Sequence, residues 1–143
     1  MTYQIITDAT ADLNEALLAG LPEVKIIPMH VQVNGKEYLF GPGGNITNEE
    51  FYAYLRAGQF ATTSQINPEN YREHFEKILK QGKDVLYLCF SSGMSRTIQS
   101  AQMAIAELRE EYPNRTILCL DTLCAAVGEG LFVMEAARYC KST

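Results

Sequence analysis

The sequence predicts an α/β domain in which a largely parallel sheet is flanked by helices and carries a β-hairpin insertion. β-favouring apolar runs alternate with amphipathic helical stretches, which is the pattern of an α/β fold. Residues 85–90 and 115–121 are almost continuously apolar, as expected for strands buried on both faces of a parallel sheet. The Asn34-Gly35 pair between β-favouring residues predicts the hairpin.

The first quarter of the chain predicts a strand, a helix and a second strand. Residues 3–7 favour a strand, and residues 11–19 favour a helix. Gly20 and Pro22 follow that helix as a stop signal. Residues 24–31 are expected to be extended.

The hairpin and a capped helix come next. The hairpin spans residues 31–40, and the glycine-rich residues 41–44 form a turn. Thr47 and Glu50 have the spacing of a capping box, which predicts that a helix begins there and continues to about residue 58.

Three helices and two buried strands complete the chain after a loop over residues 59–68, which shows no periodicity. Pro68 is suited to the first position of a helix, and Gly82 ends that helix. A second helix runs to Pro113, and the last helix covers residues 125–140. The two buried strands described above separate these helices. Apolar stripes on the first two helices are formed by Tyr71, Phe75, Ile78, Leu79, Ile98, Ala101, Ile105, Leu108 and Tyr112.

Composition limits the classes of function. The 143 residues carry a formal net charge of −5, which suits one domain and argues against a nucleic-acid surface. No apolar run reaches the roughly 18–20 residues that a membrane span needs, and the N-terminus lacks the basic head of a signal peptide. We therefore expect a cytoplasmic protein. The four cysteines form no CxxC pair and the two histidines are isolated, so the sequence predicts no metal site.

Four polar segments lie at the ends of predicted strands or in adjoining loops, where α/β sheets bind ligands. They are TDAT (7–10), TTSQ (62–65), SSGMS (91–95) and DT (121–122). In SSGMS, Gly93 permits a sharp turn, and the hydroxyls of Ser91, Ser92 and Ser95 lie beside the start of a helix. Such a helix start can hold a carboxylate or a phosphate.

Each of these segments also has a purely structural interpretation. The serines of SSGMS are equally suited to capping the helix, and TTSQ is also compatible with an ordinary polar loop. Asp8 and Asp121 either orient groups at the site or cap the helices that follow them.

Motifs for chemistry on a bound anion are missing. The sequence contains no GxxxxGK[ST], no GxGxxG and no GxSxG, and neither histidine has a motif that places it as a base for a serine. The sequence therefore predicts a protein that holds a small anion and is not an enzyme.

The ordered set of segments resembles the DegV family of fatty-acid-binding proteins. TDAT with the following ADL, TTSQINPENYREHFEKIL, LYLCFSSGMSRTIQSA and DTLCAAVGEG are similar to family motifs in order and spacing. The resemblance implies an EDD-type α/β fold and a long-chain fatty acid as ligand, with no other cofactor. It also implies a fatty acid kinase as partner, which phosphorylates the bound acid to an acyl phosphate for phospholipid synthesis.

By position, the resemblance points to two direct ligands of the carboxylate, Thr63 and Ser92. Their close neighbours in the site would be Thr62, Ser64, Ser91 and Gly93. Farther from the carboxylate, the resemblance places Asp8, Ser95, Arg96 and Asp121 around these residues.

The sequence departs from the family pattern in three ways. Ala9 replaces a usual serine, and Arg96 replaces a usual glycine. The chain also has about half the usual length, so we expect residues 1–143 to be a single domain resembling the family's N-terminal domain, without its second domain. The apolar surface that the second domain would cover is expected to favour self-association.

Two other interpretations remain open at this stage. One is a kinase-like or phosphotransfer domain that holds a phosphorylated metabolite at the same strand ends. The other is an interaction module that has lost its ligand, which Ala9, Arg96 and the short length suggest.

Overall fold

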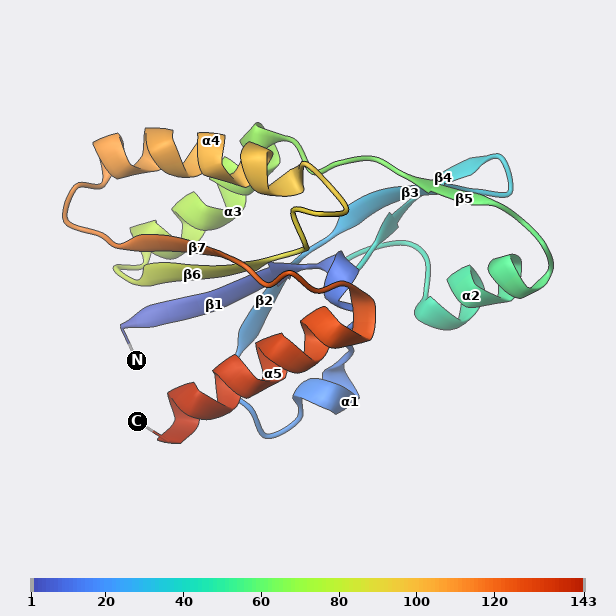
Figure 1. Cartoon of the computed structure of the whole chain (residues 1–143), viewed down its shortest axis with the longest axis horizontal. Helices are drawn as coiled ribbons and strands as arrows, with labels where there is room; N and C mark the ends of the chain where they lie inside the picture. Colours follow the sequence, from blue (N-terminus) through green and yellow to red (C-terminus); the bar gives the residue numbers. More distant parts are fainter. Residues whose placement is uncertain (1, 143) are drawn as a thin grey trace.

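Two sheets meet end to end across the middle of the molecule (Figure 1). The computed structural model describes residues 2–142. The larger sheet is parallel, has the order β2-β1-β6-β7, and consists of β1 (Tyr3–Asp8), β2 (Val24–Ile27), β6 (Asp84–Cys89) and β7 (Ile117–Asp121). The smaller sheet is antiparallel, has the order β4-β3-β5, and consists of β3 (Met29–Val33), β4 (Lys36–Phe40) and β5 (Ala61–Thr63). Pro28 separates β2 from β3 and marks the junction between the sheets.

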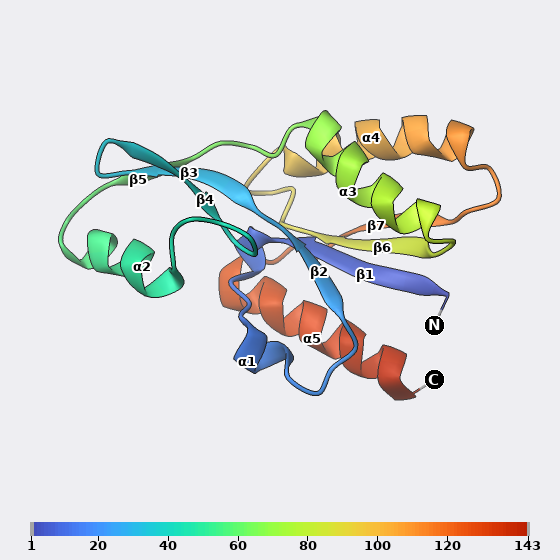
Figure 2. The same cartoon turned by 180° about the vertical axis from the view of Figure 1, so that it is seen from behind.

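Helices cover both faces of the parallel sheet. One face carries α3 (Pro68–Lys80) and α4 (Thr97–Glu111), and the opposite face carries α1 (Glu15–Leu18) and α5 (Ala126–Ser142) (Figure 1). The remaining helix, α2 (Asn48–Arg56), lies beside the small sheet, as Figure 2 shows from behind. A single 3-10 turn, η1 (Ala9–Ala11), directly follows β1. The predicted α/β architecture with a hairpin insertion is confirmed.

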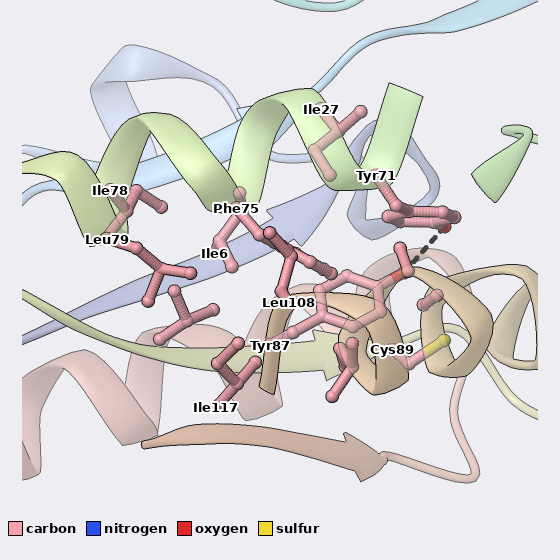
Figure 3. Packing of buried hydrophobic residues seen from close by; sticks show 14 of the residues in the cluster. Ile6, Ile27, Tyr71, Phe75, Ile78, Leu79, Tyr87, Cys89, Leu108 and Ile117 are labelled. Carbon is pink, nitrogen blue, oxygen red and sulfur yellow. Dashed lines mark hydrogen bonds between the residues drawn. The ribbon is translucent and has the colours of Figure 1, made fainter. Parts of the chain in front are cut away.

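The main core lies between the parallel sheet and the α3–α4 layer (Figure 3). Tyr71 and Phe75 of α3 pack on Tyr87 of β6, with ring centroids 5.3–5.7 Å apart. All three side chains are inaccessible to solvent. The two tyrosines therefore bring their hydroxyl groups into the protein interior, where each needs a hydrogen-bonding partner.

Several local signals in the sequence are confirmed. Asn34 and Gly35 adopt φ angles of 52° and 70°, the left-handed pair that a two-residue hairpin turn requires. Thr47 and Glu50 form both hydrogen bonds of the capping box at the start of α2. Pro68 occupies the first turn of α3.

Two predictions of secondary structure are wrong. The helix expected over residues 11–19 is reduced to η1 and the single turn α1, because Asp12 takes a left-handed conformation (φ 54°) and Asn14 starts a new cap. The loop expected over residues 59–68 contains the short strand β5, which pairs with β3. A three-residue strand has no periodicity to recognise, and only its distant partner defines it.

The order of the parallel strands creates a switch point between β1 and β6. From β1 the chain moves outward to β2, whereas from β6 it moves outward in the other direction to β7. In open α/β sheets, ligands bind in the crevice beyond the carboxyl ends of strands at such a point. Here those ends face the small sheet (Figure 1).

Apolar side chains remain exposed on β7 and α5. Leu118 and Leu120 of the edge strand β7 are 54% and 42% exposed, and Val127 and Leu131 of α5 are also exposed. We call these four residues the β7–α5 surface. Within residues 2–142, no helix has the length and apolar character needed to cross a membrane.

Candidate functional site

A pocket of about 240 Å³ lies at the switch point, between the carboxyl ends of β1 and β6 and strand β5 of the small sheet. Four apolar side chains and seven polar residues line it. The lining residues are Met29, Ile66, Phe90, Met94, Asp8, Thr10, Thr63, Ser64, Gln65, Ser95 and Thr97. The pocket therefore combines an apolar lining with hydroxyl groups from three separate segments.

Strand β5 contributes hydroxyl groups that are available to a ligand. Thr63 and Ser64 are exposed and line the pocket. Among the residues that the structure describes, neither side chain has a hydrogen-bonding partner. The Ser64 N–H donates to the carbonyl of His30 (3.1 Å), which fixes the backbone next to these hydroxyls. Thr62 lines a different hollow with His30 and Glu37, because its side chain points to the face of the strand opposite to that of Thr63. Ser64 lies between the two hollows and lines both of them.

The loop after β6 uses its hydroxyls largely for its own structure. The buried Ser91 Oγ accepts a hydrogen bond from the Gly93 N–H (3.2 Å). The Ser95 Oγ accepts one from the Thr97 N–H (3.2 Å) and one from Gln65 Nε2 (3.3 Å). Of the predicted residues in this loop, only Ser95 lines the pocket.

Asp121 connects the loop after β6 to the loop after β7. One of its carboxylate oxygens accepts hydrogen bonds from the N–H groups of Ser92 (3.3 Å) and Leu123 (3.0 Å). Hydrogen bonds from the Ser92 side chain and from these backbone groups lower the pKa of Asp121. The carboxylate and Ser92 both lie outside the lining of the pocket.

Asp8 ends β1 beneath the pocket and is 1% exposed. One of its oxygens accepts hydrogen bonds from the hydroxyls of Tyr87 (2.6 Å) and Tyr71 (3.4 Å). The Tyr71 hydroxyl also contacts those of Tyr87 (2.8 Å, dashed in Figure 3) and Thr97 (3.0 Å). Burial raises the pKa of Asp8, although the hydrogen bonds from Thr10 and the tyrosines oppose this shift.

A second buried carboxyl group, Glu129, lies next to Asp8 and was not singled out from the sequence. Its oxygens contact the hydroxyls of Thr10 (2.9 Å) and Thr7 (3.3 Å), and Thr10 also donates to Asp8. Burial, together with the charge of Asp8, raises the pKa of Glu129 to about 8. The only sequence signal was Gly130, beside Glu129.

Gly130 explains how α5 brings Glu129 so close. A Cβ atom at Gly130 would lie 2.5 Å from the carbonyl oxygen of Ala11 in η1. Only glycine therefore allows the first turn of α5 to pack directly against the backbone of η1.

The structure brings together four of the ten predicted site residues. Asp8, Thr63, Ser64 and Ser95 line the pocket, and Thr10, Gln65 and Thr97 were missed. The other six, which lie outside the pocket lining, are Thr62, Ser91, Ser92, Gly93, Arg96 and Asp121.

The two substitutions noted against the family pattern lie outside the pocket lining. Arg96 precedes α4 as its N-cap residue and is exposed. Ala9 is buried in the core of the small sheet with Val31, Phe40 and Ile46. The Ala9 side chain therefore packs in this core and does not contribute to the pocket lining.

The fold and the pocket together define a class of protein, an α/β domain with an apolar, hydroxyl-rimmed pocket at its switch point. The family model described as "Uncharacterised protein, DegV family" matches residues 2–142. A DegV domain-containing protein of Clostridium perfringens is 37% identical over 136 residues, which is 95% of this chain and 46% of that protein. The chain belongs to the DegV family and spans about half the length of the curated relatives it matches.

Solved structures agree with this assignment. A stearic acid-binding protein from Eubacterium ventriosum superposes with a TM-score of 0.85 at 26% identity, covering 98% of this chain and 48% of that one. A DegV family protein from Thermus thermophilus, described by its fatty acid binding, has a TM-score of 0.78 at 32% identity and covers 99% and 48%.

Proposed function

We propose that this chain is a fatty-acid-binding domain that holds the carboxylate of a long-chain fatty acid in the switch-point pocket. One observation carries the proposal: the unpartnered hydroxyls of Thr63 and Ser64 share the pocket with Met29, Ile66, Phe90 and Met94. Hydroxyl donors suit a carboxylate, and the four apolar side chains suit the first carbons of an acyl chain. The fatty acids bound by the relatives from E. ventriosum and T. thermophilus support the same ligand class.

The charges around the pocket are suited to weak binding of a carboxylate head group. Within the described part of the chain, its lining includes no Lys, Arg or His. The positive end of α4 lies at Ser95 and Thr97 and favours an anion there. Asp8 turns its oxygens toward Tyr87 and Thr10 in the interior, so little of its charge faces a ligand.

Most of the acyl chain must lie outside this pocket. Its volume of about 240 Å³ is below the roughly 300–1,000 Å³ of pockets that enclose a drug-sized ligand. Each buried CH₂ contributes about 0.8 kcal/mol, so a chain left in water adds little affinity. We propose that the remaining half of the longer relatives supplies this cover.

The second part of the proposal is that the domain presents the carboxylate to a fatty acid kinase and performs no chemistry itself. Thr63, Ser64 and Met94 are exposed, so a partner can approach the head group from solvent. The partner's identity comes from the family resemblance.

Native mass spectrometry of the purified chain, followed by extraction of released molecules, tests the ligand class. Co-purified C14–C18 fatty acids would support the proposal, and loss of this mass in Thr63→Val but not in Thr62→Val would assign it to the pocket. Thr62→Val is a matched control because it changes the same residue type on the opposite face of β5. Co-purified phosphate without lipid would favour the phosphotransfer interpretation instead.

We also propose that the β7–α5 surface pairs with a second copy when nothing else covers it. Its four apolar side chains are exposed, and β7 is an edge strand of the parallel sheet. Sedimentation velocity should show a concentration-dependent dimer, and Leu118→Lys should shift the chain toward monomer. A monomer at all concentrations would contradict this proposal.

A further inference from the structure

The hydroxyl of Thr10 lies between two buried carboxyl groups. It contacts Asp8 on one side and Glu129 Oε2 (2.9 Å) on the other. Asp8 is 1% exposed and Glu129 is fully buried. A hydroxyl has a single proton to donate, so Thr10 can satisfy only one of these two groups as a donor.

Glu129 also contacts the hydroxyl of Thr7, which likewise has one proton for two acceptors. The Thr7 hydroxyl lies 2.9 Å from the carbonyl of Leu88 and 3.3 Å from Glu129 Oε1. If Thr7 donates to the nearer acceptor and Thr10 donates to Asp8, both oxygens of Glu129 face oxygen atoms without a proton between them. A proton on Glu129 Oε2 removes the closer of these two conflicts, because the carboxylic acid then donates to the Thr10 hydroxyl (2.9 Å).

No cation compensates for the two carboxyl groups. Among the described residues, the titratable groups around Glu129 are Asp8 from β1 and, behind it, Tyr87 from β6 and Tyr71 from α3. The positive end of α5 favours a charged Glu129, but this effect is small beside the cost of burying a second carboxylate without a counterion. The raised pKa of Glu129, about 8, agrees with this balance.

We propose that Glu129 is a protonated positioning residue: it donates to Thr10, which in turn donates to Asp8, and this chain fixes the wall of the head-group pocket. Thr10 and Asp8 line the pocket, whereas Glu129 acts on it only through Thr10. This role rests on the proposed function, since it assumes that the pocket holds a carboxylate.

Loss of the Glu129 proton should weaken ligand binding. Ionised Glu129 would place a second negative charge one hydroxyl away from the pocket and would compete for the Thr10 proton. At an effective dielectric constant near 20, a repulsion over this range lowers carboxylate affinity by roughly tenfold or more. Affinity should therefore fall as the pH rises through about 8.

The experiment compares wild type with Glu129→Gln and Glu135→Gln. Glutamine keeps a donor in place of the protonated acid and cannot ionise. Glu135 is an exposed carboxylate on the same helix, paired with Arg138, and serves as the control. Unfolding by urea is followed from pH 5 to pH 9 without ligand, and decanoate, a soluble fatty acid, is then titrated at pH 6.5 and pH 9.

The ligand-free arm tests the proton alone. The pKa of Glu129 in the folded state, about 8, lies above its unfolded value of about 4.3. Between these two values the folded state holds one more proton than the unfolded state, so the stability of the protein falls as the pH rises. Relative to Glu129→Gln, the folding equilibrium constant of wild type should fall about tenfold for each pH unit in this window. Equal slopes for wild type and Glu129→Gln would overturn the proposal.

The ligand arm tests the positioning role. Wild type and Glu135→Gln should bind decanoate roughly tenfold more weakly at pH 9 than at pH 6.5, whereas Glu129→Gln should show no such change. The same loss in Glu129→Gln, or no loss in wild type, would overturn the role. If wild type bound no decanoate at either pH, the proposed function would fail for this chain, and the ligand-free slopes would still decide where the proton lies.

Discussion

The loops at residues 62–65 and 91–95 carry similar hydroxyl groups but use them differently. In the first loop, Thr63 and Ser64 have no partner among the described residues and line the pocket. In the second, Ser91 accepts a hydrogen bond from Gly93, and Ser92 supports Asp121. The first segment overlaps the end of strand β5, whereas the second follows strand β6 and leads into α4.

The cause of the contrast is the backbone of each loop. The second loop turns sharply into α4, and a helix start leaves N–H groups that nearby hydroxyls satisfy. The first loop is extended through β5, and β3 already satisfies its backbone groups. Hydroxyls on an extended segment therefore stay available to a ligand, whereas those at a helix start are used to build the turn.

The largest effect in this comparison is expected for Ser91, whose substitution should lower the free energy of unfolding. Ser91→Ala leaves the N–H of Gly93 without its acceptor and should lower the free energy of unfolding by about 1–2 kcal/mol. Ser64→Ala in the other loop should change it by less than about 0.5 kcal/mol. Urea denaturation measures both, and equal losses would break the comparison.

A somewhat smaller effect is expected at Asp121. Its lowered pKa means that the folded state favours the carboxylate, so Asp121 contributes stability above its unfolded pKa of about 3.9, and this contribution is lost as the pH falls through the lower folded value. Because solvent screens the partly exposed side chain, we expect no more than about 1 kcal/mol. Urea titrations of wild type and Asp121→Asn between pH 6 and pH 3 should converge at the acid end. A constant difference would contradict the assignment.

For ligand binding, Thr63→Val in the first loop should have a larger effect than a substitution in the second loop. It removes one hydroxyl from the pocket and should weaken fatty acid binding about fivefold, equivalent to about 1 kcal/mol. Stability should change little, since the variant keeps the shape and β-propensity of the strand. Calorimetric titration checks this, with Thr62→Val as the control that should bind like wild type.

The smallest effect is expected for Ser92→Ala, which should change fatty acid affinity less than about twofold because Ser92 lies outside the pocket lining. The family resemblance points to Ser92 as a direct ligand together with Thr63. If Ser92→Ala weakened binding as much as Thr63→Val, the sequence-based assignment would be right and the ligand would extend over both loops.

Signals that depend on neighbouring residues were predictable from the sequence. The left-handed pair Asn34-Gly35 and the capping box of Thr47 and Glu50 are set by local backbone chemistry, and both are confirmed. The apolar runs correctly predicted β6 and β7, but β7 is not buried on both faces as expected, because it is an edge strand with Leu118 and Leu120 exposed. These elements were enough to predict the α/β fold.

The parts of the fold and of the pocket that the sequence did not predict depend on contacts between residues far apart in the chain. Strand β5 exists because it pairs with β3, about thirty residues earlier. The contact between Thr10 and Glu129 joins residues 119 positions apart and requires the close approach that Gly130 permits. Local sequence patterns do not reveal such contacts, so the way in which these segments come together at the pocket was not predictable.

The pocket also has a chemical weakness, which follows from Met94. This thioether is 70% exposed at the rim of the pocket. Peroxide oxidises accessible methionines to the sulfoxide, which turns a flexible apolar side chain into a polar one. Oxidation would therefore make this part of the rim polar while leaving the hydroxyls of Thr63 and Ser64 intact. A methionine sulfoxide reductase would then reverse the damage without new protein synthesis.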